Sequence, residues 1–228
     1  MPTRRSRTTP SVPASSKEAL TNSDSDGTRR SRLEIYDLKK ETRDFQDKQF
    51  LIPFGEYMPI YTRAFMTAVG RGEEYAGVIP RLDRRPGYNT RPLAAGSALV
   101  GVLFCNEVTS PTLYRSLAEE GAGVFINIAS HGWFHGSYIV AQQMRSVAIV
   151  RAVESRRWYV QASDVAPSFV LDPYGRVAIT SAWGLTGSVE ATVEIRHDQT
   201  PYVRFGPWVI WLAVAWLLIM FIRSRERV

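Results

Sequence analysis

The stretch that decides the fold runs from Leu99 to Glu107 and reads LVGVLFCNE. Its first six residues form a continuous apolar run, which predicts a strand buried on both faces. The run stops at Cys105, the only cysteine of the chain, and a carboxylate follows at Glu107. The predicted strand therefore presents a thiol, with an acidic group close behind it, at one edge of a sheet.

The sequence around this strand alternates predicted strands with predicted helices. Ser110-Pro111 combines an N-cap residue with proline at the first helical position, and predicts a helix that Gly121 closes. Residues 137–156 carry apolar side chains at helical spacing and predict an amphipathic helix on a sheet. Further strands are predicted over 123–128, 158–162, 168–171, 176–179 and 189–195, the last from strict apolar and polar alternation. The fold class is therefore α/β with a mixed sheet.

Composition bounds the rest of the chain. The 228 residues, 45% of them hydrophobic, suffice for one domain with a core and tails, and a single cysteine excludes an intrachain disulfide. Much of the net charge of +6 lies near the two ends, and no basic stripe with interleaved aromatics is visible, so no nucleic-acid partner is expected. Residues 1–31 are polar and basic, and we expect a disordered tail there.

The other end of the chain is strongly apolar. Phe205–Ile222 reads FGPWVIWLAVAWLLIMFI, which as a helix is about 27 Å long and matches a hydrocarbon core of roughly 30 Å. The stretch lacks the polar face of a soluble helix. Basic residues follow at once, and the positive-inside rule places them in the cytoplasm. We expect a transmembrane helix over 203–223, a cytoplasmic basic tail over 224–228, and the preceding domain on the outer side.

A second stretch, Lys48 to Glu56, reads KQFLIPFGE and supplies an ammonium and another carboxylate. A thiol is a poor nucleophile until it loses its proton, and a nearby cation favours that loss. Lys48 can stabilise a thiolate or donate hydrogen bonds to a tetrahedral oxyanion. Glu56 can fix Lys48 by an ion pair, and Glu107 can orient the same ammonium or an incoming amine. These residue types predict acyl transfer through a thioester on Cys105.

The order of the motifs resembles that of the apolipoprotein N-acyltransferases, integral membrane members of the nitrilase (carbon-nitrogen hydrolase) superfamily. The matching motifs are Lys48 to Glu56, Phe104 to Glu107, Asn127 to Phe134 and Asp172 to Val177, and TPYVRFG at 200–206 resembles the exit into a last membrane helix. The resemblance covers about residues 33–223. It implies a nitrilase-like α-β-β-α sandwich over 32–202, N-terminally truncated and followed by one transmembrane helix.

The resemblance also implies a two-step reaction. Cys105 takes an acyl chain from a phospholipid donor, and the α-amino group of a diacylglyceryl-cysteine on a lipoprotein accepts it. The implied site comprises the nucleophile Cys105, the oxyanion stabiliser Lys48, the supporting Glu56, Glu107 and Asn106, and an entrance loop with Trp133 and Phe134. No cofactor is implied and no metal, since His131, His135 and His197 form no ligand cluster. The implied location is the bacterial inner membrane, with the domain on the periplasmic side.

Several features depart from the family pattern. The general-base glutamate, usual at the end of an apolar strand upstream of Lys48, has no counterpart here, since Glu34 and Glu41 lie in a polar segment too close to the lysine. The N-terminal membrane helices of the family are also missing. Asn106 stands where tyrosine is usual, and Ser130-His131 where Asn-Asp is usual. We expect a partial or split enzyme, with a companion chain that carries the missing parts, unless the start is misassigned or the gene decayed. A membrane-tethered nitrilase-type amidase and an inactive scaffold stay open as alternatives.

Overall fold

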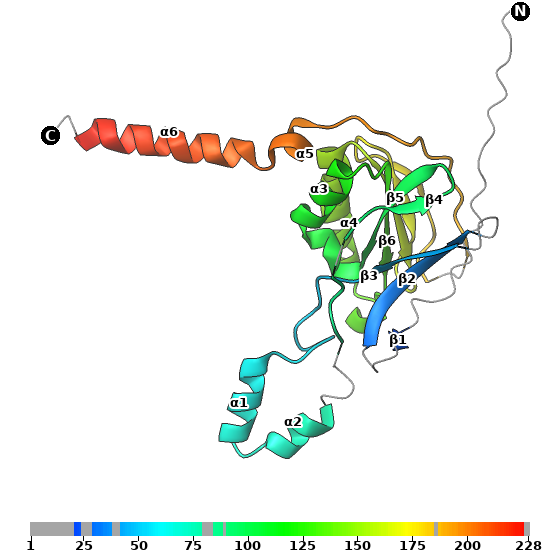
Figure 1. The fold of residues 1–228 in the computed structure, drawn as a ribbon, viewed down its shortest axis with the longest axis vertical. Helices are drawn as coiled ribbons and strands as arrows, with labels where there is room; N and C mark the ends of the chain where they lie inside the picture. The colour runs from blue at the N-terminus through cyan, green and yellow to red at the C-terminus, as the bar shows by residue number, and fades with distance from the viewer. Residues whose placement is uncertain are drawn as a thin grey trace, which may run out of the picture.

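The computed structural model describes residues 21–23, 29–37, 42–78, 84–88, 90–184 and 187–225. A six-stranded mixed sheet has the order β4-β5-β6-β7-β8-β9, and a three-stranded antiparallel sheet has the order β1-β2-β3. Helices α3 (Pro111–Glu119) and α4 (Tyr138–Ser155) cover one face of the larger sheet, and the smaller sheet lies against the other (Figure 1). These layers confirm the predicted α/β class.

The larger sheet is built around the strand that ends at the cysteine. This strand, β5, pairs in parallel with β6, which pairs in parallel with β7, and the remaining pairs are antiparallel. The parallel arrangement places the carboxyl ends of β5 and β6 at one edge of the sheet. The strands are β4 (Leu93–Ala95), β5 (Ala98–Phe104), β6 (Val124–Ala129), β7 (Trp158–Ser163), β8 (Phe169–Leu171) and β9 (Val177–Thr180).

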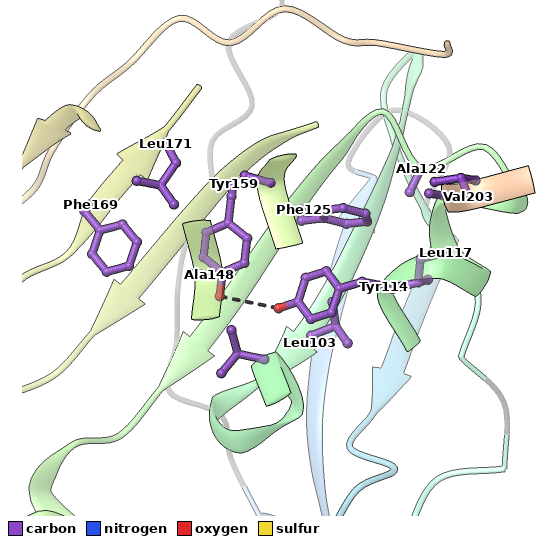
Figure 2. Packing of buried hydrophobic residues seen from close by; sticks show 13 residues of the cluster. Leu103, Tyr114, Leu117, Ala122, Phe125, Ala148, Tyr159, Phe169, Leu171 and Val203 are labelled. Atoms are coloured by element: carbon purple, nitrogen blue, oxygen red, sulfur yellow. Dashed lines mark hydrogen bonds between the residues drawn. The ribbon is translucent and has the colours of Figure 1, made fainter. Parts of the chain in front are cut away.

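Two apolar clusters hold the layers together, one on each face of β5. Leu103 packs towards the helices with Phe125 and Tyr114, whereas Val102 and Phe104 pack towards the smaller sheet. Figure 2 shows the helix-side cluster. In it the rings of Tyr114 and Phe125 pack edge to face, with their centroids 4.9 Å apart. Because both faces of β5 are covered, the strand reads as a continuous apolar run.

The expected strand over 189–195 does not form. The structure has no ladder there, although Val193 and Ile195 pack against the cluster on the smaller-sheet side. The Arg196 N–H donates to the Gly123 carbonyl at 3.3 Å, so the segment runs extended past the sheet. Alternating burial produced the strand-like pattern, but the ladder hydrogen bonds that define a strand are absent from this described segment.

The smaller sheet begins within the segment expected to be a tail. Strand β2 (Arg29–Asp37) pairs with β3 (Thr42–Asp47), and β1 (Thr21–Ser23) pairs with β2. Leu33 and Ile35 of β2 pack against the larger sheet, which anchors the strand. Residues 1–20 and 24–28 of the expected tail lie outside the described residues.

Two helices, α1 (Ile60–Ala68) and α2 (Gly72–Val78), lie between β3 and β4 along the chain. At the C-terminal end, α5 (Pro201–Phe205) precedes α6 (Trp208–Arg225), and Gly206 breaks the helix with φ +64°. Val203 of α5 is fully buried in the helix-side cluster, so the candidate membrane-spanning helix starts at Trp208, after the expected position 203. Helix α6 is apolar, long enough to cross a bilayer, and wholly unburied where it extends from the domain (Figure 1).

Candidate active site

Cys105 stands where β5 gives way to the 3-10 turn Cys105–Thr109. Its φ is +48°, in the left-handed region that a non-glycine residue adopts only when its surroundings hold it there. The side chain is half-buried and carries a free thiol. The sharp turn therefore lifts the thiol out of the strand direction at the edge of the sheet, as the end of the apolar run predicted.

Lys48 directly follows β3 and is almost completely buried. Its Nζ lies 2.7 Å from Oε2 of Glu56, which is itself buried, so the predicted ion pair is confirmed. The same carboxylate oxygen accepts the Ile52 N–H at 2.9 Å. A tight turn brings Glu56 back to the lysine, with Phe54 at φ +62°. The ammonium is thus fixed in place by a charge-assisted hydrogen bond.

Glu107 forms no ion pair with Lys48 among the described residues; burial raises its pKa, and backbone N–H groups and the charge of Lys48 lower it. Its carboxylate is buried and accepts three backbone N–H groups: those of Gln49 at 2.6 Å, Phe50 at 2.9 Å and Phe104 at 2.8 Å. Two of these donors follow Lys48 and the third precedes Cys105. Glu107 therefore ties the lysine segment to the cysteine segment, and Asn106 adds a bond from Nδ2 to the Phe50 carbonyl at 3.2 Å.

The electrostatics of the thiol are a balance of opposing effects. Burial raises the pKa of Cys105, while the charge of Lys48 lowers it, as do the backbone N–H groups of Asn106 and Ser130; Glu56 raises it. The net pKa lies above that of an ordinary thiol. The site accordingly holds Cys105 as a protonated thiol at neutral pH, beside a cation that favours the thiolate once a proton acceptor is supplied.

The loop after β6 carries the expected entrance residues. Trp133 lies in the 3-10 turn Gly132–Phe134 and is 65% exposed, whereas Phe134 is half-buried. The loop starts at the same edge of the sheet as Cys105, because Phe104 of β5 pairs with Ile128 of β6. The three histidines belong to no group that could hold a metal ion within the described residues.

Two charged residues of this region were missed from the sequence. Asp164 follows β7 and anchors the loop, because its carboxylate accepts the Ser130 hydroxyl at 2.6 Å and the His131 N–H at 2.7 Å. Arg84 reaches the Glu56 carboxylate at 3.6 Å and donates to the Ser31 hydroxyl at 2.6 Å. Arg84 stands in polar sequence and Asp164 directly follows a strand, but neither belongs to a motif, so only the folded chain could show their partners.

Comparison with known proteins gives a consistent family. The carbon-nitrogen hydrolase family model matches residues 45–199. Apolipoprotein N-acyltransferase of Geobacter metallireducens is 26% identical over 174 residues, 74% of this chain and 31% of that protein. The enzyme of the same name from Nostoc sp. is 30% identical over 190 residues, 78% of this chain and 35% of that protein. The chain therefore spans about a third of the length of the curated relatives it matches.

Solved structures support the same fold. The carbon-nitrogen hydrolase of Helicobacter pylori aligns with a TM-score of 0.54 at 13% identity, over 72% of this chain and 56% of that chain. The NitFhit protein of Caenorhabditis elegans aligns with a TM-score of 0.52 at 16% identity, over 72% of this chain and 38% of that one. At such identities the likeness concerns the fold alone. Together with the family match over most of the domain, it shows that this chain belongs to the carbon-nitrogen hydrolase family, with relatives named apolipoprotein N-acyltransferase.

Proposed function

We propose that this chain carries the nucleophile of an apolipoprotein N-acyltransferase and transfers an acyl chain from a phospholipid to a lipoprotein amine through a thioester on Cys105. The observation that carries the proposal is the ammonium of Lys48, locked by Glu56 at 2.7 Å and close enough to the thiol to lower its pKa against the effect of burial. The names of the relatives supply the substrate class.

In the first step the sulfur of Cys105 attacks the ester carbonyl carbon of the phospholipid. The carbonyl electrons move to oxygen, and the oxyanion accepts hydrogen bonds from Lys48 Nζ and from backbone N–H groups at the start of the 3-10 turn. The intermediate collapses to the thioester, and the lysophospholipid leaves with the proton that the thiol gave up. In the second step the lipoprotein amine attacks the thioester, loses a proton, and the Cys105 thiol is released.

Both steps need a group that moves the proton. Glu56 is occupied by Lys48 and the Ile52 N–H, and Glu107 is occupied by three backbone donors. We propose that a carboxylate other than these two acts as the general base, and that a companion chain contributes it. The relatives, about three times longer than the matched region, are large enough to contain both parts in one chain.

We further propose that α6 spans the bacterial inner membrane, with its basic end in the cytoplasm and the domain in the periplasm. The helix ends with Arg223 and Arg225, as the positive-inside rule requires for a cytoplasmic end. The exposed Trp133 then serves at the lipid entrance, since indole side chains favour the membrane interface.

The test is an adduct experiment on the full chain, expressed in bacterial membranes with and without a co-expressed companion chain. Intact-mass measurement should show Cys105 heavier by one acyl chain, with loss of that mass on hydroxylamine treatment and no adduct in Cys105→Ala. The companion arm should show a higher adduct yield if it supplies the base. An absence of adduct in the companion arm overturns acyl transfer, and turnover of small amides without phospholipid identifies a tethered amidase instead.

A further inference from the structure

A buried chain of polar side chains runs behind the nucleophile, on the helix side of the larger sheet. It comprises Asn127 of β6, Gln161 and Tyr159 of β7, and Tyr114 of α3, with exposed fractions of 0%, 3%, 0% and 1%. Asn127 interrupts an apolar strand two residues after Phe125, on the face where the aromatic core packs. Burying a polar group is unfavourable unless it is hydrogen-bonded. The hydrogen-bond partners of these residues therefore indicate their role.

The chain of bonds ends on the backbone of the nucleophile. Asn127 donates from Nδ2 to the Cys105 carbonyl at 3.2 Å and to Gln161 Oε1 at 3.1 Å. Gln161 Oε1 also accepts the Tyr159 hydroxyl at 3.0 Å. The Tyr114 hydroxyl donates to the Tyr159 hydroxyl at 3.4 Å, which is the bond drawn in Figure 2. Burial raises the pKa of Tyr159, so its hydroxyl stays a donor. Asn127 and Gln161 pair directly across β6 and β7, which sets the spacing of their amides.

The carbonyl that Asn127 holds belongs to the peptide between Cys105 and Asn106. A peptide unit is planar and trans, so its C=O and N–H point in opposite directions. Fixing the carbonyl on the Asn127 side therefore turns the Asn106 N–H to the other side, and this N–H lowers the pKa of the thiol against the effect of burial. Cys105 has a left-handed φ and opens the 3-10 turn, so its carbonyl lies outside the β5 ladder, and Asn127 supplies a side-chain donor to it.

We propose that Asn127, braced by Gln161, is a positioning residue that aims the Asn106 N–H at the reacting sulfur and at the oxygen of the bound acyl group. The part of this role that concerns the acyl oxygen rests on the proposed function. The part that concerns the sulfur does not depend on which substrate the thiol attacks. Asn127 touches no reacting atom itself, and Gln161 acts only by keeping both Asn127 protons correctly directed.

The test measures the reactivity of the thiol and needs neither lipid nor acceptor. The full chain in detergent is treated with iodoacetamide from about pH 6 to pH 10, and the alkylation rate of Cys105 is followed by intact mass. Asn127→Leu keeps the branched shape and the number of heavy atoms but removes the amide donor, and Gln161→Met removes the brace. Val203→Ala is the matched control, because it opens a cavity in the same core beside Ala122, which precedes the amino end of β6 (Figure 2).

For Asn127→Leu we expect the midpoint of the pH profile to rise by about one unit, which lowers the rate below that pH about tenfold. For Gln161→Met we expect a smaller rise, and for Val203→Ala none at a similar loss of thermal stability. A profile for Asn127→Leu that matches the native one, or a Val203→Ala shift of equal size, overturns the proposal. If Asn127→Leu does not fold, the pH profile of Gln161→Met is compared with that of Val203→Ala instead, and the same outcomes apply. A shifted profile in a protein that forms no acyl adduct rejects acyl transfer while keeping the positioning role.

Discussion

Replacing Glu56 by glutamine is the sharpest perturbation of the site, because it removes the carboxylate that neutralises a buried ammonium. Lys48 is 2% exposed, and its Nζ lies 2.7 Å from Glu56 Oε2. Removing one partner of a buried ion pair costs about 3–5 kcal/mol, since the other charge is left uncompensated. Glutamine keeps one acceptor oxygen for Lys48 or for the Ile52 N–H, so we expect the lower end, about 3 kcal/mol.

This loss is a large part of the free energy of unfolding of a domain, about 5–15 kcal/mol. For a domain of this size each 1 kcal/mol lowers Tm by about 2–4 °C, so Glu56→Gln should lower Tm by about 6–12 °C. Thermal unfolding in detergent, followed by near-ultraviolet circular dichroism, measures the shift. Glu74→Gln is the matched control, because Glu74 forms an exposed ion pair with Arg71. This variant should have the Tm of the native protein.

A second variant separates the effect of the unpaired ammonium from the effect of changing the Glu56 side chain. Lys48→Met combined with Glu56→Gln removes both charges, so no uncompensated ammonium stays buried, and the double variant should unfold at a higher temperature than Glu56→Gln alone. The ion-pair reasoning is refuted by either of two results. One is a Glu56→Gln protein with the native Tm, and the other is a double variant no more stable than the single one.

Three further perturbations test other parts of the fold. Glu107→Gln leaves backbone donors without an acceptor and should lower the unfolding free energy by about 1–3 kcal/mol in urea titration; an unchanged midpoint would contradict the bridging role. Burial alone would raise the pKa of Asp164, but bonds from Ser130 and from backbone N–H groups lower it overall, so its stabilisation is present above about pH 4 and is lost on further acidification. Asp164→Asn should therefore flatten the fall in Tm between about pH 5 and pH 3, and an equal fall in both proteins would exclude this carboxylate. Gly101→Ala places a Cβ 2.8 Å from a ring carbon of Phe125 and should cost about 1–3 kcal/mol by overpacking, measured by the same unfolding titration; a native value would mean that the ring can move freely.

Much of the fold could be predicted because its signals are local. The apolar run before Cys105, the Ser110-Pro111 helix start and the apolar spacing after Ser137 each depend on a few neighbouring residues, and the structure confirms the elements. The pattern at 189–195 misled because alternating burial does not require a hydrogen-bonded partner strand. The start of the last helix shifted for a similar reason, since Val203 is apolar but packs into the domain core.

The candidate site divides in the same way. The residue types and spacing around Lys48 and Glu56 predicted the ion pair, since a short turn links the two residues and limits where they can lie. Glu107 was expected to orient the ammonium or an incoming amine, and its carboxylate accepts backbone N–H groups from both segments. A carboxylate accepts either kind of donor, and only the folded backbone decides which donor lies within reach.

The sequence by itself determined that a buried strand ends in a thiol, that a lysine and a glutamate stand ready to pair, and that an apolar helix follows the domain. The tertiary structure alone decided which groups hold the cysteine backbone and the neighbouring loop. Asn127, Gln161 and Asp164 come from strands or loops far from Cys105 along the chain, and parallel pairing across three strands brings them to the same sheet edge. Local patterns record the strand, but contacts between strands exist only after the sheet has formed.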